Sequence, residues 1–188
     1  TCCGQPAYNG GNEKDAIAIA QMLIRQFGEY DFVVTPSASC AGMIKNHYPK
    51  ILENHAQWAE AAQDLSAKTH ELFSFLVNIR GLKSVATKCE RKVVYHDSCS
   101  SLREVKCARE ARTLLSTVEG LEVLDMPETE ICCGFGGLFS IKYPEISARM
   151  ADDKIANAKT TEADLLIGPD LGCLIHIAGR LSRKGEKI

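Results

Sequence analysis

Apolar residues recur at helical spacing in two well-separated segments of the chain. In residues 13–27 the apolar positions fall on one face of a helix, and residues 144–159 carry a sparser set with the same period. Each segment is followed by a short apolar run that begins at an aspartate and ends at a proline, in residues 31–36 and 164–169. Such runs are typical of short buried strands. A helix followed by a strand in both halves predicts βαβ-like units and a largely parallel sheet.

The middle of the chain predicts further elements of both kinds. Apolar residues near helical spacing predict one long helix over residues 54–80, which Gly81 would end, and a second helix over residues 101–117. Runs rich in valine and leucine at residues 92–95 and 121–124 predict two more strands. Strands thus alternate with helices along the whole chain.

We therefore expect an α/β fold made of two pseudo-repeated, Rossmann-like half-domains with a mostly parallel sheet. Residues 1–88 would form the first, truncated repeat with its connecting helix, and residues 89–188 would form the second. By comparison with the second repeat, we expect the amino-terminal strand of the first repeat to be missing from the chain.

The internal repeat extends to the cysteines. The sequence Cys-Cys-Gly occurs at residues 2–4 and again at residues 132–134. Cys40 follows 37 positions after the first pair, and Cys173 follows 40 positions after the second. Adjacent cysteines cannot easily bond to each other within ordinary disulfide geometry, but both can face one metal centre. The duplication predicts two equivalent metal sites, or one site built where the half-domains meet.

Composition excludes several classes of function. A net charge of -2, spread over 188 residues, argues against a nucleic-acid partner, whose binding requires a concentrated basic face. No apolar run approaches the roughly 20 residues of a membrane-spanning segment, and the first residues lack the features of a signal peptide. Nine cysteines, an odd number in a chain of this length, favour metal or redox chemistry in the cytoplasm over a disulfide framework.

The second repeat contains the more complete set of sulfur ligands. Cys99 follows a predicted strand, the pair Cys132 and Cys133 lies in a predicted loop, and Cys173 begins a predicted helix. We expect all four to meet at the carboxyl edge of the parallel sheet. Thiolates select iron–sulfur clusters or zinc over magnesium or calcium. His176, three positions after Cys173, is a further candidate ligand, although a buried or surface histidine fits the pattern equally well.

Glycines follow the second cysteine pair. Gly134, Gly136 and Gly137 would let the backbone approach an inorganic group closely and donate N–H groups to it. A flexible turn is the alternative interpretation.

The first repeat offers a smaller set of ligands, Cys2, Cys3 and Cys40. Met43 stands three positions after Cys40, where we expect packing rather than metal binding. Cys89 and Cys107 fall outside the repeat and are expected to be bystanders. His96 is the best candidate for a proton carrier, although a hydrogen-bonded histidine at a strand end is equally consistent with the sequence; no other catalytic residue can be named.

Four segments together resemble the cysteine-rich (CCG) domain family. They are TCCGQPAYN at residues 1–9, YHDSC at residues 95–99, CCGFGG at residues 132–137 and GPDLGC at residues 168–173. That family includes a cysteine-rich component of heterodisulfide reductase and the iron–sulfur subunit of glycolate oxidase, and the resemblance is greatest to the lactate utilisation protein A group. It covers essentially the whole chain. The family pattern has cysteine where this chain has Met43 and His176.

The resemblance implies an iron–sulfur redox subunit, with a cluster of 4Fe–4S type, in a complex that oxidises L-lactate to pyruvate or acts on a related 2-hydroxy acid. Its partners would be the other subunits of that complex and an electron acceptor, either a protein or a quinone. Cluster ligation would fall on the cysteines of both repeats, Cys2, Cys3, Cys40, Cys99, Cys132, Cys133 and Cys173.

Two alternatives remain open on the residues alone. Three thiolates with His176 would form a closed Cys₃His zinc site, as in structural or assembly modules. Thiol–disulfide exchange through Cys132 and Cys133 is the other.

Overall fold

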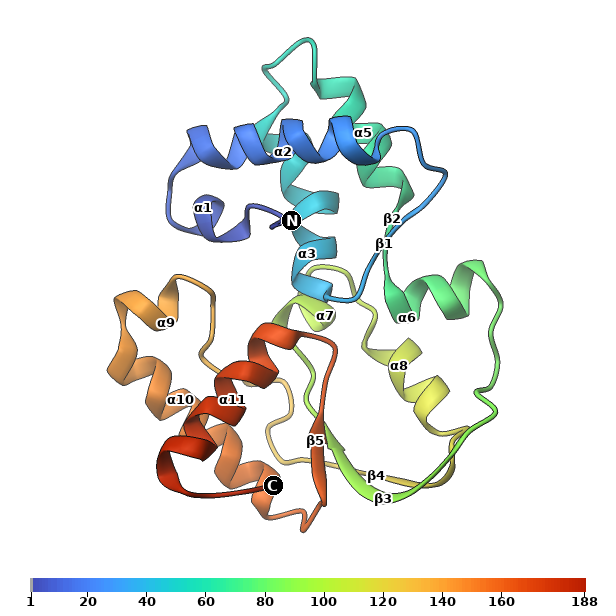
Figure 1. Cartoon of the computed structure of the whole chain (residues 1–188), viewed down its shortest axis with the longest axis vertical. Helices are drawn as coiled ribbons and strands as arrows, with labels where there is room; N and C mark the ends of the chain where they lie inside the picture. Colours follow the sequence, from blue (N-terminus) through green and yellow to red (C-terminus); the bar gives the residue numbers. More distant parts are fainter. Residues whose placement is uncertain (1) are drawn as a thin grey trace.

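The chain forms two stacked lobes, each with a small parallel sheet and several helices (Figure 1). The computed structural model describes residues 2–188; Thr1, the first residue of the predicted first repeat, lies outside the described residues. The helices are α1 (Gln5–Asn9), α2 (Glu13–Phe27), α3 (Ala38–Gly42), the π-helical η1 (Met43–His47), α4 (Tyr48–Ile51), α5 (Ala59–Lys68), α6 (Leu72–Ser74), the π-helical η2 (Phe75–Ile79), α7 (Cys99–Arg103), α8 (Ala108–Leu115), α9 (Phe139–Lys142), α10 (Pro144–Lys159) and α11 (Leu171–Lys184). The strands are β1 (Val33–Thr35), β2 (Thr69–Glu71), β3 (Lys88–Tyr95), β4 (Glu119–Leu124) and β5 (Leu165–Ile167).

All strand pairs in the described residues are parallel, which confirms the predicted α/β class. In the first lobe β1 pairs with β2, and in the second lobe the strand order is β4-β3-β5. Tyr95, the last residue of β3, is in register with Ile167, the last residue of β5. The two strands therefore end at the same level, and the residues that follow them emerge side by side.

The repeated helix–strand units form as predicted. Helices α2 and α10 have the bounds that their apolar periodicity predicts, and β1 and β5 lie within the predicted runs. Each lobe has its own core: residues between Cys3 and Leu65 form one cluster, and residues between Val94 and Leu181 form two others. The division of the chain at residues 88 and 89 stays a prediction.

Two predicted helices are interrupted in the structure. The long helix expected over residues 54–80 is wrong, because residues 69–71 leave α5 to form β2, which pairs with β1 and buries Thr69 and Glu71. The helix expected over residues 101–117 is split into α7 and α8, with Lys106 between them at a φ of 54°. Pairing with a distant strand overrides local helical periodicity, which sequence spacing alone does not reveal.

None of the described helices has both the length and the apolar character that crossing a lipid bilayer requires.

A buried ion pair fixes the segment between β3 and α7. Asp97 is 3% exposed and accepts two hydrogen bonds from the Arg112 guanidinium, at 2.6 and 2.7 Å, and one from the Thr129 hydroxyl at 3.0 Å. The same guanidinium lies 4.9 Å from the centre of the Tyr95 ring. Because Asp97 lies between His96 and Cys99, this network holds the loop that carries both residues.

We predict that Arg112→Met destabilises the protein by about 2–3 kcal/mol, because Asp97 would keep a buried charge without its cation. The loss is smaller than for a fully buried pair, since the Arg112 side chain is 37% exposed. Urea denaturation measures the change. Arg149→Met, which removes the exposed pair with Asp153, is the control and should change stability by less than about 0.5 kcal/mol. Equal effects of both variants would contradict this assignment.

Candidate metal centre

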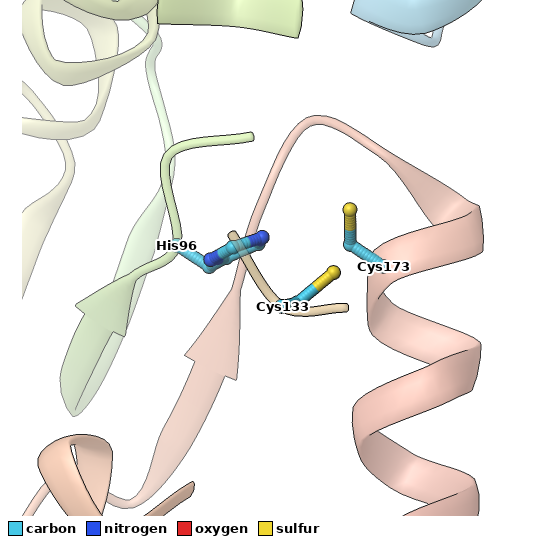
Figure 2. A group of neighbouring side chains, drawn as sticks. All are labelled: His96, Cys133 and Cys173. Carbon is cyan, nitrogen blue, oxygen red and sulfur yellow. The ribbon is translucent and has the colours of Figure 1, made fainter. Parts of the chain in front are cut away.

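Three side chains from distant parts of the chain point toward one another in the second lobe (Figure 2). His96 follows β3, Cys133 lies on the loop before α9, and Cys173 lies in the first turn of α11. One nitrogen of His96 and the two sulfurs lie within 4.8 Å of one another. The ends of two neighbouring parallel strands and one helix amino-terminus thus deliver soft ligand atoms to the rim of the sheet, where ligands of open α/β folds bind.

The group is shielded from solvent. Cys133 is 1% exposed, Cys173 is 8% exposed and His96 is fully buried. In the described chain, neither ring nitrogen of His96 has a hydrogen-bond partner of ordinary geometry. Because buried polar atoms are normally satisfied, the unpaired imidazole indicates a ligand or a hydrogen-bond acceptor at this point.

Each of the four cysteines of the second repeat has at least one other of them as a hydrogen-bonding neighbour, which shifts its pKa. The Cys133 thiol, followed by that of Cys99, lowers the pKa of Cys132. Cys133 likewise lowers the pKa of Cys173, and His96 contributes in the same direction. Hydrogen bonds to the neighbouring thiols, and then partial or full removal from water, raise the pKa values of Cys99 and Cys133. The four sulfurs therefore form one connected group.

Gly134 shapes the loop around Cys132. Its N–H donates to Cys132 Sγ at 3.3 Å, and its φ of 84° is one that side-chain-bearing residues rarely adopt. A Cβ at Gly134 would lie 2.8 Å from Met150 Cβ on α10. Gly4 repeats the arrangement, with its N–H 3.4 Å from Cys2 Sγ and a φ of 82°. Both repeats thus form the same turn, in which the glycine N–H donates to the sulfur of the first cysteine. A contact between Gly134 and a cofactor stays a prediction.

Gly136 and Gly137 also have positive φ values, of 53° and 60°. These angles fit a tight turn, and the predicted role of both residues at a cofactor remains untested.

The first repeat brings Cys3 and Cys40 together. The buried Cys3 thiol lowers the pKa of Cys40 to about 7, while Cys40 and burial raise that of Cys3. Both line a groove of about 540 Å³ beside β1, whose other walls are mainly apolar. Cys2 is exposed. The first repeat therefore contains a partial sulfur site.

Asp170 links the two repeats where their cysteine-bearing helices begin. Its Oδ1 accepts hydrogen bonds from the hydroxyls of Ser37 and Ser39, the latter at 2.6 Å. Asp170 precedes α11 and Ser37 precedes α3, at matching positions of the repeat. The amino-termini that carry Cys40 and Cys173 consequently face each other across the interface between the lobes.

Other predicted residues lie elsewhere. His176 Nε2 lies 3.2 Å from the Ser147 hydroxyl and its ring packs beside Phe135, so its ligand role stays a prediction. Met43 is fully buried in the first core, which confirms the packing interpretation. Cys107 is buried beside Glu71, away from the repeat.

The sequence places His96 near Cys99 but does not show that its ring lies among the sulfurs, because only the pairing of β3 with β5 brings it there.

The donor set fits a soft metal. Four neighbouring sulfurs and one imidazole match the ligands of an iron–sulfur cluster or of zinc and do not match hard cations. Cys133, Cys173 and His96 are buried, whereas Cys99 and Cys132 are half-buried. In the metal-free protein, the neighbouring thiols donate hydrogen bonds to one another. A metal that binds the sulfurs as thiolates would displace the protons of those hydrogen bonds.

Comparison with known proteins decides the family. The family model described as CCG, cysteine-rich domain, matches residues 1–45 and 93–178. The chain belongs to the cysteine-rich (CCG) domain family. Both matched parts contain a Cys-Cys-Gly turn and the single cysteine that follows it.

Curated relatives of this CCG protein are similar over its full length. The chain is 45% identical to lactate utilization protein A 2 of Bacillus cereus (strain Q1) and 44% identical to lactate utilization protein A 1 of Bacillus anthracis (strain CDC 684 / NRRL 3495), covering 78% of each. It is also 44% identical to lactate utilization protein A of Halalkalibacterium halodurans, of which it covers 77%. All of these alignments span 100% of the chain.

We predict that alkylation of Cys40 in the metal-free protein increases as the pH rises through about 7, because its pKa lies below that of an ordinary thiol. Burial raises the pKa of Cys107, which should stay largely unmodified over the same range. Iodoacetamide labelling followed by mass spectrometry of the peptides measures both. Equal labelling of the two cysteines at neutral pH would show that Cys40 is not activated by Cys3.

Proposed function

We propose that this chain is the iron–sulfur redox subunit of a complex that oxidises L-lactate, or a related 2-hydroxy acid, to the 2-oxo acid. The observation that carries the proposal is the group formed by Cys99, Cys132, Cys133 and Cys173 at the rim of the second sheet, of which Cys133 and Cys173 are buried. Membership of the CCG family and the names of its relatives support the substrate class.

The residues of the second repeat would hold a cluster of the 4Fe–4S type through those four thiolates. When bound, such a cluster accepts and passes on single electrons. Oxidation of a 2-hydroxy acid releases two electrons and two protons, so a further acceptor, either a protein or a quinone, must remove the electrons. The chain would act with other subunits, in the cytoplasm, as an oxidoreductase component.

His96 would support the centre from within. Its fully buried ring can donate an N–H to a sulfur, bind the metal directly, or carry a proton as electrons arrive. The Gly134 N–H, which already donates to Cys132 Sγ, would keep that sulfur electron-poor and so favour the reduced state.

A zinc site is the second candidate function. The close approach of His96, Cys133 and Cys173 suits a tetrahedral zinc centre completed by another thiolate. Such a centre would be colourless, free of acid-labile sulfide and inactive in electron transfer. Metal analysis of anaerobically prepared protein separates the two candidates.

We predict that Cys133→Ser removes most of the iron and acid-labile sulfide, because it takes one thiolate from the middle of the connected group. Cys107→Ser is the matched control, since Cys107 is also buried, at 3% exposure, but lies away from the group. Iron and sulfide are measured in protein purified without oxygen. Equal metal content in both variants would show that the ligands lie elsewhere.

A second pair of variants tests the histidines. We expect His96→Ala to change the electron paramagnetic resonance spectrum of the reduced protein or to lower its iron content, because the ring lies among the sulfurs. His176→Ala should leave both measurements unchanged, since its Nε2 contacts Ser147. The reverse outcome would restore His176 as the ligand predicted from the sequence.

A further inference from the structure

A lysine lies buried behind the second cysteine pair. Lys154 on α10 is 1% exposed, and its Nζ donates to the carbonyl oxygens of Glu128 at 2.8 Å and Thr129 at 3.2 Å. These carbonyls belong to the segment that leads into Cys132. Among residues 2–188, no carboxylate forms an ion pair with this ammonium group.

A buried ammonium without a counter-charge is expensive, so its surroundings indicate what balances it. The carboxylates nearest to Lys154, those of Glu128 and Glu130, belong to exposed residues. The neighbouring thiols that can carry negative charge are those of Cys133, which is buried, and Cys132, which is half-buried. The cation therefore faces a site that is built to carry negative charge.

Helix α10 presents Lys154 to that site through one continuous face. Ser147 on the same face donates its hydroxyl to the Gly134 carbonyl at 2.8 Å, and Met150 leaves no room for a side chain at Gly134, whose Cβ would lie 2.8 Å from Met150 Cβ. Positions 147, 150 and 154 are spaced by three and four residues, so they share one side of the helix. The side chain of Lys154 is thus held against the cysteine loop by the packing of the whole helix.

At the matching position of the first repeat, helix α2 has Leu23 where α10 has Lys154. Four buried positions of α2 recur on α10 at a constant displacement of 131 residues. The matching pairs are Ala16 and Ser147, Ala20 and Ala151, Leu23 and Lys154, and Ile24 and Ile155. Ile19 and Met150 are also 131 residues apart, and each lies closest to where a Cβ would stand on the glycine of its own repeat, Gly4 or Gly134. The two repeats therefore share a helix–loop packing in which only the second carries a buried cation.

We propose that Lys154 is the counter-charge of the metal–thiolate centre in the second repeat and raises its reduction potential. This inference rests on the proposed function, because it assigns a role toward the cluster. A fixed positive charge stabilises the more negative, reduced state of a nearby centre and strengthens the binding of its thiolates. Lys154 acts on the centre through space as a positioning residue and is not itself a ligand.

The test compares Lys154→Met with a matched lysine variant in anaerobically purified protein. Lys45→Met is the control, because Lys45 Nζ also donates to two backbone carbonyls, of Ser66 at 3.2 Å and Thr69 at 2.9 Å, in the first lobe. We expect Lys154→Met to shift the midpoint potential to a more negative value and to release iron to a ferrous chelator about tenfold faster. Lys45→Met should match the wild-type protein in both measurements.

The outcomes distinguish a failure of the proposed role of Lys154 from a failure of the proposed redox function. Unchanged potential and iron release in Lys154→Met, with intact iron and sulfide in the wild type, overturns the role of Lys154 and leaves the redox function standing. Zinc in place of iron overturns the redox function and the effect of Lys154 on the reduction potential, and release of zinc to a zinc chelator then tests the counter-charge alone. Wild-type protein that binds neither metal overturns both. Lys154→Gln, which keeps a donor for the carbonyls, replaces Lys154→Met if circular dichroism shows that the latter is unfolded.

Discussion

Thiols from four places in a chain can share one metal only if the fold brings them to one point and keeps water away. Here two neighbouring parallel strands, β3 and β5, end at the same level, so His96 and the segment leading to Cys173 emerge side by side. Helix α10 packs against the Cys-Cys-Gly turn of the second repeat and holds it at this rim. Every other feature of the proposed centre depends on that register, because a shift of one strand would separate the sulfurs.

Three buried charged side chains near the cysteines support the interpretation of this region as a metal centre. Asp97 is neutralised by Arg112, and Asp170 accepts two hydroxyl hydrogen bonds from the other repeat. Lys154 has only carbonyl partners. Protein interiors seldom keep an uncompensated cation, so a negative centre among the neighbouring sulfurs explains its retention. Position-matched Leu23 shows that the shared packing does not itself require a lysine.

The repeat and the second cysteine group could be predicted from the sequence because both depend on patterns within short segments of the chain. The apolar periodicity of the sequence predicts helices α2 and α10, and Cys99 and Cys173 follow the ends of predicted strands. The strand at residues 69–71 could not be predicted, because its helical neighbours mask it and its partner β1 lies far away in sequence. His96 was a candidate proton carrier from the sequence, but its place among the sulfurs was not predicted because it depends on strand pairing. The nearness of Lys154 to the sulfurs was not predicted either, because it depends on the rotation of α10. Spacing made His176 a candidate ligand one helical turn from Cys173; its Nε2 lies 3.2 Å from the Ser147 hydroxyl, and its ligand role stays a prediction.

X-ray absorption at the iron edge of the wild-type protein, prepared without oxygen, tests the proposed centre most directly. A sulfur-dominated first coordination shell with a second shell of iron would agree with a cluster held by thiolates of the second repeat. A sample without iron, or iron coordinated mainly by nitrogen and oxygen, would contradict it.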